Sequence, residues 1–189
     1  MKTNLFLKVL ATLLLCTVFS VGINAQNTFS KGDNNLNLGI GIGSTLGGST
    51  TLPPLSVSYE RGIIDNLFDA KSSLGIGAYL GYARNKDEWT FDANKYGWKY
   101  SYTIIGARGA LHYQLVDKLD TYAGLMLGYN IVSSTTYGNW GTNKYTAAGN
   151  DLGWSLFIGG RYYFSDNIGA FAELGYGIAY LQLGISFKF

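Results

Sequence analysis

The chain ends with Ala179-Tyr180-Leu181-Gln182-Leu183-Gly184-Ile185-Ser186-Phe187-Lys188-Phe189, where apolar residues occupy one parity and tyrosine, polar residues and glycine the other. Only a β-strand places successive side chains on opposite faces. The segment therefore predicts a strand with one continuous apolar face. The same alternation recurs from Leu36 onward, which favours an all-β protein.

Period-two alternation marks eight candidate strands. They span residues 34–44, 55–61, 73–84, 100–114, 119–133, 151–164, 168–177 and 178–189. Most of them approach or exceed the roughly 9 to 11 residues that a tilted strand needs to cross a membrane. Eight strands also make the smallest common closed membrane barrel.

The predicted connections alternate in length. Those after the second, fourth and sixth strands are short and contain Asp65-Asn66, Asp117-Lys118 and Asp166-Asn167, residue types that favour tight turns. Those after the first, third and fifth strands are longer, whereas the last connection, near residues 176–178, is short and breaks the trend. Short turns at one end and long loops at the other predict an eight-stranded antiparallel up-and-down transmembrane barrel.

The composition of the two parities predicts which face meets lipid. The parity opposite the apolar one is rich in glycine, which makes a poor soluble surface but suits the narrow interior of an eight-stranded barrel. We expect the apolar parity to carry no charge in any of the eight segments, since a charge at mid-bilayer costs about 2 to 4 kcal/mol. Aromatic residues on this parity predict two interfacial belts. The periplasmic belt would contain Tyr59, Tyr113, Tyr162, Phe164, Phe187 and Phe189, and the outer belt Tyr82, Tyr129, Trp154 and Tyr176.

Residues 1–25 have the pattern of a cleaved signal peptide: a basic start with Lys2 and Lys8, an apolar run and a small residue, Ala25. We expect residues 26–189 to form the barrel. The single cysteine, Cys16, lies in the signal, and its surroundings weakly resemble a lipoprotein box in which Leu15 is too large for the usual small residue.

Charge and ligand residues exclude several functions. Without Lys2 and Lys8, the 14 basic residues fall to 12 and equal the 12 acidic ones, so there is no basic footprint for nucleic acid. One histidine and no cysteine after residue 25 argue against a metal centre, and we expect no cofactor.

These features together resemble the small eight-stranded outer-membrane barrels of the OmpA/OmpX-like superfamily, in the form of an outer membrane protein β-barrel domain. The most specific feature is the C-terminal strand with Leu183, Ile185, Phe187 and Phe189, which is similar to the signal read by the barrel-assembly machinery. The resemblance implies insertion into the lipid of a Gram-negative outer membrane. We expect a monomer.

The inward parity also carries charge, in Glu60, Arg108, His112, Arg161, Glu173 and Lys188. An unpaired charge in a narrow lumen is very costly, so we expect Glu60 and Glu173 to pair with Arg108 and Arg161. The further partners would be His112 and the tyrosines Tyr79, Tyr102, Tyr122 and Tyr163. Such a network predicts a plugged barrel. A narrow pore for small solutes is the alternative, and it would need a lumen that these residues do not close.

A second alternative is an outer-membrane enzyme. Some small barrels modify lipid A or cleave peptides with a histidine, but those families place the site near the outer rim. His112 lies close to the predicted periplasmic turn at Asp117, so we expect no enzyme.

The predicted outer loops carry aromatic residues among charges. Residues 85–99 include Trp89, Phe91 and Trp98, and the next loop includes Trp140. Such mixtures are typical of recognition surfaces, which favours a structural envelope protein with surface recognition through its loops. Alternatively, these segments continue the hairpins above the membrane, with aromatic side chains stacked across strands. Both can hold, since a protruding hairpin also offers an edge for strand addition.

Overall fold

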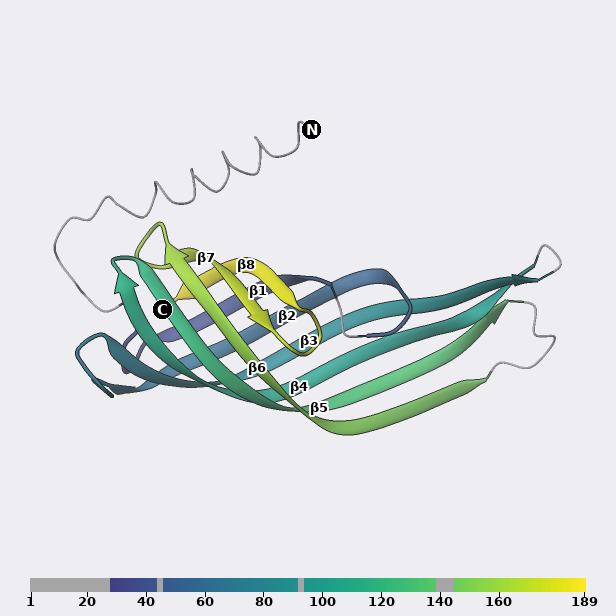
Figure 1. Ribbon diagram of the computed structural model, residues 1–189, viewed down its shortest axis with the longest axis horizontal. Helices are drawn as coiled ribbons and strands as arrows, with labels where there is room; N and C mark the ends of the chain where they lie inside the picture. The colour runs from purple at the N-terminus through teal and green to yellow at the C-terminus, as the bar shows by residue number, and fades with distance from the viewer. Residues whose placement is uncertain (1–27, 44–45, 92–93, 139–144) are drawn as a thin grey trace, which may run out of the picture.

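The computed structural model describes residues 28–43, 46–91, 94–138 and 145–189. Figure 1 shows strands β1 (Asn34–Ile42), β2 (Ser49–Asp65), β3 (Ser72–Phe91), β4 (Asn94–Val116), β5 (Leu119–Gly138), β6 (Thr146–Tyr163), β7 (Ile168–Gly175) and β8 (Leu181–Lys188). Each strand is antiparallel to its neighbours in chain order, and β1 pairs with β8 to close the ring. The predicted eight-stranded up-and-down barrel is confirmed. The expected signal peptide, with Cys16, lies outside the described residues.

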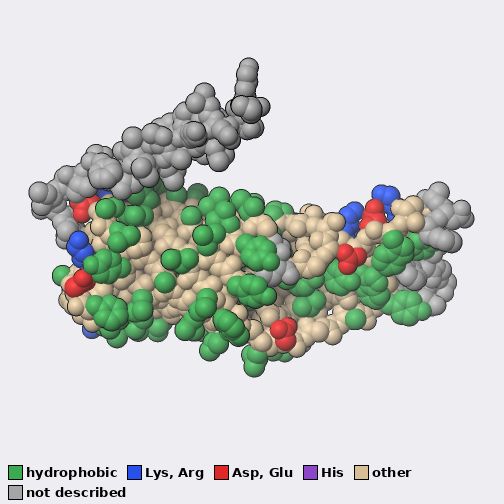
Figure 2. Space-filling model, in the orientation of Figure 1, with side chains coloured by type: hydrophobic (Ala, Val, Ile, Leu, Met, Phe, Trp, Pro, Cys, Tyr) green, Lys and Arg blue, Asp and Glu red, His purple; other side chains and the backbone are tan. Residues whose placement is uncertain are grey.

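Apolar side chains face outward along the barrel wall. Leu125 is 53% exposed and Leu156 57% exposed, whereas a Cβ added to Gly159 would lie 2.6 Å from the buried ring of Tyr122. In Figure 2 hydrophobic side chains form a broad band, with Lys, Arg, Asp and Glu toward the left end and in the right half. The prediction that the apolar parity faces outward and the glycine-rich parity faces the lumen is therefore confirmed. In the described residues no helix combines the length and apolarity needed to cross a membrane.

Two arginines contradict the prediction that the outward parity is free of charge. Arg61 lies outward opposite Asn34, the first residue of β1, and Arg84 lies outward with its guanidinium 5.4 Å from the ring centre of Tyr82. Both lie near the margins of the apolar band. Charged side chains are tolerated there because water and lipid head groups can solvate them.

The strands differ strongly in length, so the wall is uneven. β3, β4, β5 and β6 have 20, 23, 20 and 18 residues, whereas β7 and β8 have 8 each and β1 has 9. In Figure 1 the ribbons of β3 to β6 continue to the right, well past the β7–β8 hairpin. The barrel therefore has a tall wall, β3 to β6, and a short wall, β7, β8 and β1.

Most of the predicted second loop is strand. Residues 85–91 of β3 pair with 94–100 of β4 in unbroken register from Asn85↔Tyr100 to Phe91↔Asn94. The prediction of a loop over 85–99 is therefore wrong, and the alternative of a continued hairpin holds. The pattern misled because the apolar side chains change parity there: Leu80 and Tyr82 lie on the outward parity of β3, whereas Trp89 lies on the inward one.

The predicted boundary between the last two strands is also wrong. β7 ends at Gly175 and β8 begins at Leu181. Ile178 and Ala179, expected in a strand, instead fold into the lumen and are only 2% and 3% exposed. They pack in an apolar cluster whose buried members are Tyr79, Ala83, Ile104, Ala110, Tyr122, Met126, Phe157, Ile178 and Ala179. Alternation could not reveal this bend, because Ala179 is apolar and fits the lipid-facing parity of the last strand equally well, although it is buried in the lumen.

Candidate functional site

The half of the lumen nearest the short turns holds a buried cluster of charged side chains; we call it the periplasmic half, and the other the extracellular half, after the orientation predicted from the sequence. Glu60 and Arg161 are fully buried, and Arg108, His112 and Glu173 are 3 to 5% exposed. They converge from β2, β4, β6 and β7. Glycine leaves the space they need, since a Cβ at Gly75 would lie 2.7 Å from Glu60 Oε1.

Three of these side chains, Glu60, His112 and Arg161, form a closed ring with Asp120 of β5. Arg161 donates to Glu60 through one guanidinium nitrogen and to Asp120 Oδ2 through the other, at 3.0 Å. His112 lies between the same carboxylates, with Nε2 2.9 Å from Glu60 Oε1 and Nδ1 2.8 Å from Asp120 Oδ1. Because both ring nitrogens face carboxylate oxygens, both contacts become hydrogen bonds when the imidazole carries two protons.

A second pair lies beside the ring. Arg108 donates to Glu173 Oε2 at 2.7 Å, and the Tyr122 hydroxyl donates to the same oxygen at 3.0 Å. The Arg108 guanidinium also lies 3.9 Å from the centre of the Phe157 ring. With His112 protonated, the three cations of the cluster balance the three carboxylates, as burial requires.

The structure brings together the predicted network residues and adds Asp120. Glu60 meets Arg161, and Glu173 meets Arg108, as the sequence suggested. Asp120 was missed, although it lies two positions before Tyr122 and so shares its inward parity.

The other predicted partners lie apart from the ring. The Tyr79 hydroxyl donates to Gln182 at 3.3 Å, and Tyr163 shares a hydrogen bond with Asn35. Tyr102 instead stacks on Tyr100 in the extracellular half, with ring centres 6.3 Å apart. The Lys188 amine donates to the carbonyl of Thr28 at 3.4 Å.

The segment before β1 closes the periplasmic end. Phe29 is 3% exposed, and its ring centre lies 4.2 Å from that of His112. Thr28 N donates to Gln114 Oε1 at 2.8 Å, and Ser73 Oγ donates to the carbonyl of Phe29 at 3.0 Å. Nothing in the alternation of the strands marks Phe29 as a lumen residue, because it precedes the first strand.

The ion cluster and the apolar cluster leave little free space between them. A cavity of about 20 Å³ lies among Arg108, Glu173, Phe157 and Ile178. Such a volume holds about one water molecule. The described residues also contain no group of three or more His, Cys, Asp or Glu side chains that could hold a metal ion.

The extension of the tall wall past the short wall presents two faces with different side chains. By strand parity, Trp89 of β3 and Trp98 of β4 lie on the face that continues the lumen, which we call the concave face. Trp89 is 43% exposed and Trp98 is half-buried. The side chain of Phe91, and Trp140 as a whole, lie outside the described residues.

The opposite, convex face carries a polar cross-link at Glu88, which forms ion pairs within the β3–β4 hairpin and accepts a hydrogen bond from Tyr137 of β5. Glu88 Oε2 accepts hydrogen bonds from Tyr137 at 2.7 Å and Lys86 at 3.0 Å, and Lys95 lies 3.0 Å from Oε1. Hydrogen bonds from Tyr137, Lys95 and Lys86 lower the pKa of Glu88 to about 2. Partial desolvation and the bond to Glu88 raise the pKa of Tyr137 to about 12.

The predicted assembly residues lie on β8 and just beyond it. Leu183 is 38% exposed, Ile185 49% and Phe189 66%, and Phe187 is half-exposed. They form the lipid-facing side of β8, the strand that closes the barrel by pairing with β1. Their recognition by an assembly machinery stays a prediction.

Comparison with solved structures identifies the architecture. Ail, the attachment invasion locus protein of Yersinia pestis solved with the heparin analogue sucrose octasulfate, matches with a TM-score of 0.52 at 9% identity, covering 84% of this chain and 99% of Ail. The N-terminal barrel of Pseudomonas aeruginosa OprF matches with a TM-score of 0.52 at 14% identity, covering 84% and 98%. The chain has the fold of the small eight-stranded outer-membrane β-barrels. No protein-family model matches it, and no curated protein does so at significance.

Proposed function

We propose that this protein is a non-conducting barrel of the Gram-negative outer membrane that serves the envelope structurally and presents its tall wall for recognition of an extracellular ligand. The solved neighbours are Gram-negative outer-membrane proteins, which supports the location. The apolar outer band supports the same location, because a large exposed apolar surface marks an interaction site and a band on the outside of a closed barrel suits contact with lipid.

The filled lumen supports the proposal that the barrel does not conduct ions. The ring of Glu60, His112, Asp120 and Arg161 fills the periplasmic half, and the apolar cluster around Ile178 covers it. An ion would have to displace paired charges and then pass an apolar layer. Reconstitution in planar bilayers tests this point, and steady single-channel currents from the wild-type barrel would contradict it.

The concave face, with Trp89 and Trp98, supports the proposal that the protein recognises an extracellular ligand. Trp89 and Trp98 stand on strands that extend past the short wall, where aromatic side chains with charged neighbours favour binding of a protein or glycan. The neighbour Ail was solved with a heparin analogue, so heparin is a suitable first probe together with extracellular-matrix proteins.

The recognition test replaces residues 89–96 with Asn-Gly, because Glu88 and Gly97 face each other across the hairpin and can flank a two-residue turn. Vesicles containing the shortened barrel should lose binding to immobilised heparin or matrix proteins that the wild type retains. Trp89→Ser with Trp98→Ser should reproduce the loss, whereas Tyr137→Ser on the convex face should not. Unchanged binding by the shortened barrel would argue against recognition by this hairpin.

We further propose that His112 has no catalytic role. Its two ring nitrogens are both engaged by carboxylates, it is 3% exposed, and Phe29 covers it. A substrate would have to dismantle the ring to reach it. Release of acyl chains or peptide fragments by the purified wild type, abolished by His112→Asn, would contradict this view.

A further inference from the structure

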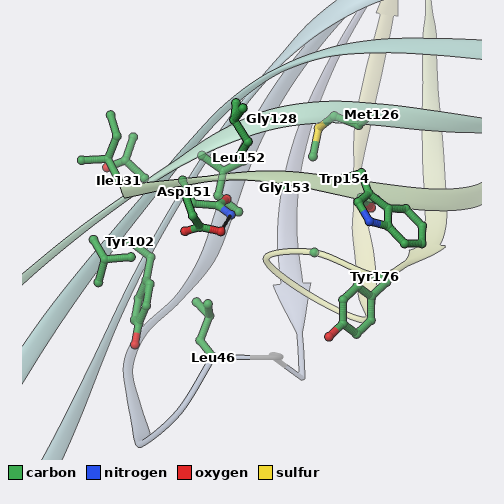
Figure 3. Close-up of a pocket in the computed structure, with 16 residues that line it drawn as sticks. Leu46, Tyr102, Met126, Gly128, Ile131, Asp151, Leu152, Gly153, Trp154 and Tyr176 are labelled. Atoms are coloured by element: carbon green, nitrogen blue, oxygen red, sulfur yellow. Dashed lines mark hydrogen bonds between the residues drawn. The ribbon is translucent and has the colours of Figure 1, made fainter. Parts of the chain in front are cut away.

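A cavity of about 460 Å³ lies in the extracellular half, above the segment joining β7 to β8. Figure 3 shows Met126 and Trp154 from the tall wall, with Leu46 from the β1–β2 connection and Tyr176 from the β7–β8 connection. Its volume falls within the roughly 300 to 1,000 Å³ typical of small-molecule sites. The cavity was invisible in the alternation pattern because it depends on where strands end.

The cavity opens sideways past the edge of β6. β7 begins to pair with β6 only at Phe157↔Gly175, and the Leu156 carbonyl accepts a hydrogen bond from Tyr176 N, so among the described residues 146–155 of β6 pair with β5 alone. Leu152 and Trp154 are 84% and 68% exposed on the lipid-facing parity, and yet they line the same cavity as the lumen-facing Met126. A cavity lined by both faces of one wall has its mouth toward the membrane.

The floor of this cavity is closed. Ile178 is 2% exposed beneath it, and the bend is held by Tyr180 N donating to Gly43 O at 3.3 Å and Gly175 N donating to Tyr180 O at 3.0 Å. Next to Ile178, a space of about 20 Å³ lies beside the Arg108–Glu173 pair, and Phe157 of the apolar cluster packs directly on Arg108. The cavity is therefore a dead end, which suits binding rather than passage.

Polar groups gather at one end of the cavity. Asn130 Nδ2 donates to Asp151 Oδ2 at 3.1 Å, and Asp151 is the charged side chain of the lining. Residues 146–155 of β6, which do not pair with β7, also present backbone N–H and C=O groups at the strand edge. These groups require polar partners, because hydrocarbon cannot form hydrogen bonds with them. This end of the cavity matches a polar head group, and its carboxylate disfavours an anionic one.

We propose that this cavity binds one hydrocarbon chain of an amphiphile from the outer leaflet. The chain enters sideways over the short wall and packs against Met126 and Ile104. The head remains beside Asn130 and Asp151 and is uncharged, zwitterionic or cationic. The membrane supplies the occupant, since the residues at the mouth are also those that face lipid.

Photolabelling tests the proposal. The wild-type barrel is reconstituted in phosphatidylcholine vesicles containing lysophosphatidylcholine with a diazirine at the end of its chain, and the adducts are mapped by mass spectrometry. We expect adducts on the lumen-facing Met126 and Ile104 in addition to Leu127, which faces lipid and is 64% exposed. Labelling of Leu127 without either lumen residue would overturn the proposal.

A filling variant sharpens this test. A Cβ at Gly128 would lie 3.4 Å from both Ile104 Cγ2 and Ile105 O, which are ordinary contacts, and Gly128 lines the cavity, so we expect the side chain of Gly128→Leu to extend into it. Displacing about two methylenes of the bound chain should lower the Met126 adduct, relative to Leu127, about ten-fold. Gly160→Leu is the matched control, because Gly160 lies outward and its nearest neighbours are 3.7 Å from a Cβ. An unchanged ratio in Gly128→Leu would overturn the proposed position of the chain.

Heat-modifiable gel mobility checks that each variant is folded. Ser155→Leu, at another position that lines the cavity, replaces Gly128→Leu if that variant does not fold.

The preference for the head group is tested with two probes of equal chain length. A diazirine alkyl-trimethylammonium should label Met126 more than the corresponding fatty carboxylate, and Asp151→Asn should abolish the difference. Equal labelling of the wild type by both heads would overturn the assignment of Asp151.

Discussion

The two halves of the lumen are built from the same alternating strands and yet differ in what they contain. The periplasmic half is filled by a ring of paired charges in which Glu60 and Arg161 are fully buried. The extracellular half contains a cavity of about 460 Å³ and opens toward the membrane. The difference follows from strand length, because only the periplasmic half is enclosed by all eight strands. Charges can be fully paired where partners converge from every side, whereas an interrupted wall leaves space and an unpaired edge.

The largest expected effect is on the charged half. Arg161→Ala leaves Glu60 and Asp120 buried without their shared cation, and breaking such a network costs about 3 to 5 kcal/mol. Unfolding by urea in vesicles should measure this loss. Arg61→Ala, an exposed arginine on the outer face, is the control and should change stability by about 0.5 kcal/mol or less. Equal effects of the two substitutions would mean that the ring contributes nothing specific.

A somewhat smaller effect is expected at the boundary between the halves. Ile178→Ala removes apolar atoms from a residue that is 2% exposed and should cost about 2 to 4 kcal/mol in the same unfolding measurement. Leu152→Ala, at a side chain 84% exposed, serves as the control and should cost far less. If Ile178→Ala were neutral, the inward bend between β7 and β8 would not stabilise the barrel.

Conductance distinguishes a plug from a gate. Glu173→Ala breaks the pair with Arg108 but leaves both the ring around Arg161 and the apolar layer around Ile178. We therefore expect no steady current in planar bilayers from this variant, as from the wild type. Large, steady currents from a folded Glu173→Ala barrel would instead identify the Arg108–Glu173 pair as a gate.

The smallest effect is expected at the tip of the tall wall, where water screens the Glu88 cross-link. The pKa of Glu88 is lowered in the fold, so its contribution is complete above the ordinary value of 4.5 and is lost as the pH falls toward about 2. Carboxyl NMR of Glu88 should give a midpoint near 2, and amide exchange in residues 85–91 should accelerate only below the ordinary value. A Glu88 midpoint near 4.5 would show that Tyr137, Lys86 and Lys95 do not act on it.

Much of the barrel and of its charged half could be predicted from alternation. The strand phase assigns Leu125 to lipid and Glu60 to the lumen, and exposures of 53% and 0% agree. The high free energy of an isolated buried charge predicted that the two glutamates would pair with the two arginines, and the structure shows which pairs form. Asp120 lies on the same inward parity, so the same reasoning predicts that it also pairs with a buried cation.

The features that escaped prediction lie where alternation carries no information. Phe29 precedes the first strand, and Ile178 lies between two strands, so neither has a strand face. The charged residues 86–88 suggested a loop, although they continue β3. In this hairpin the aromatic side chains Trp89 and Trp98 lie on the inward parity, opposite to the apolar parity of the barrel strands, so the alternation that marks those strands does not continue in phase.

The sequence by itself determined the number of strands, their antiparallel order and the face that meets lipid, since these depend on period-two alternation and turn residues close together in the chain. Only the tertiary structure decided the height of each wall, the closed ring and the lateral cavity. These features join residues far apart in sequence, as in the contact between Glu60 and Arg161 across 101 positions. Alternation specifies where a side chain points, but closure of the barrel determines what it meets.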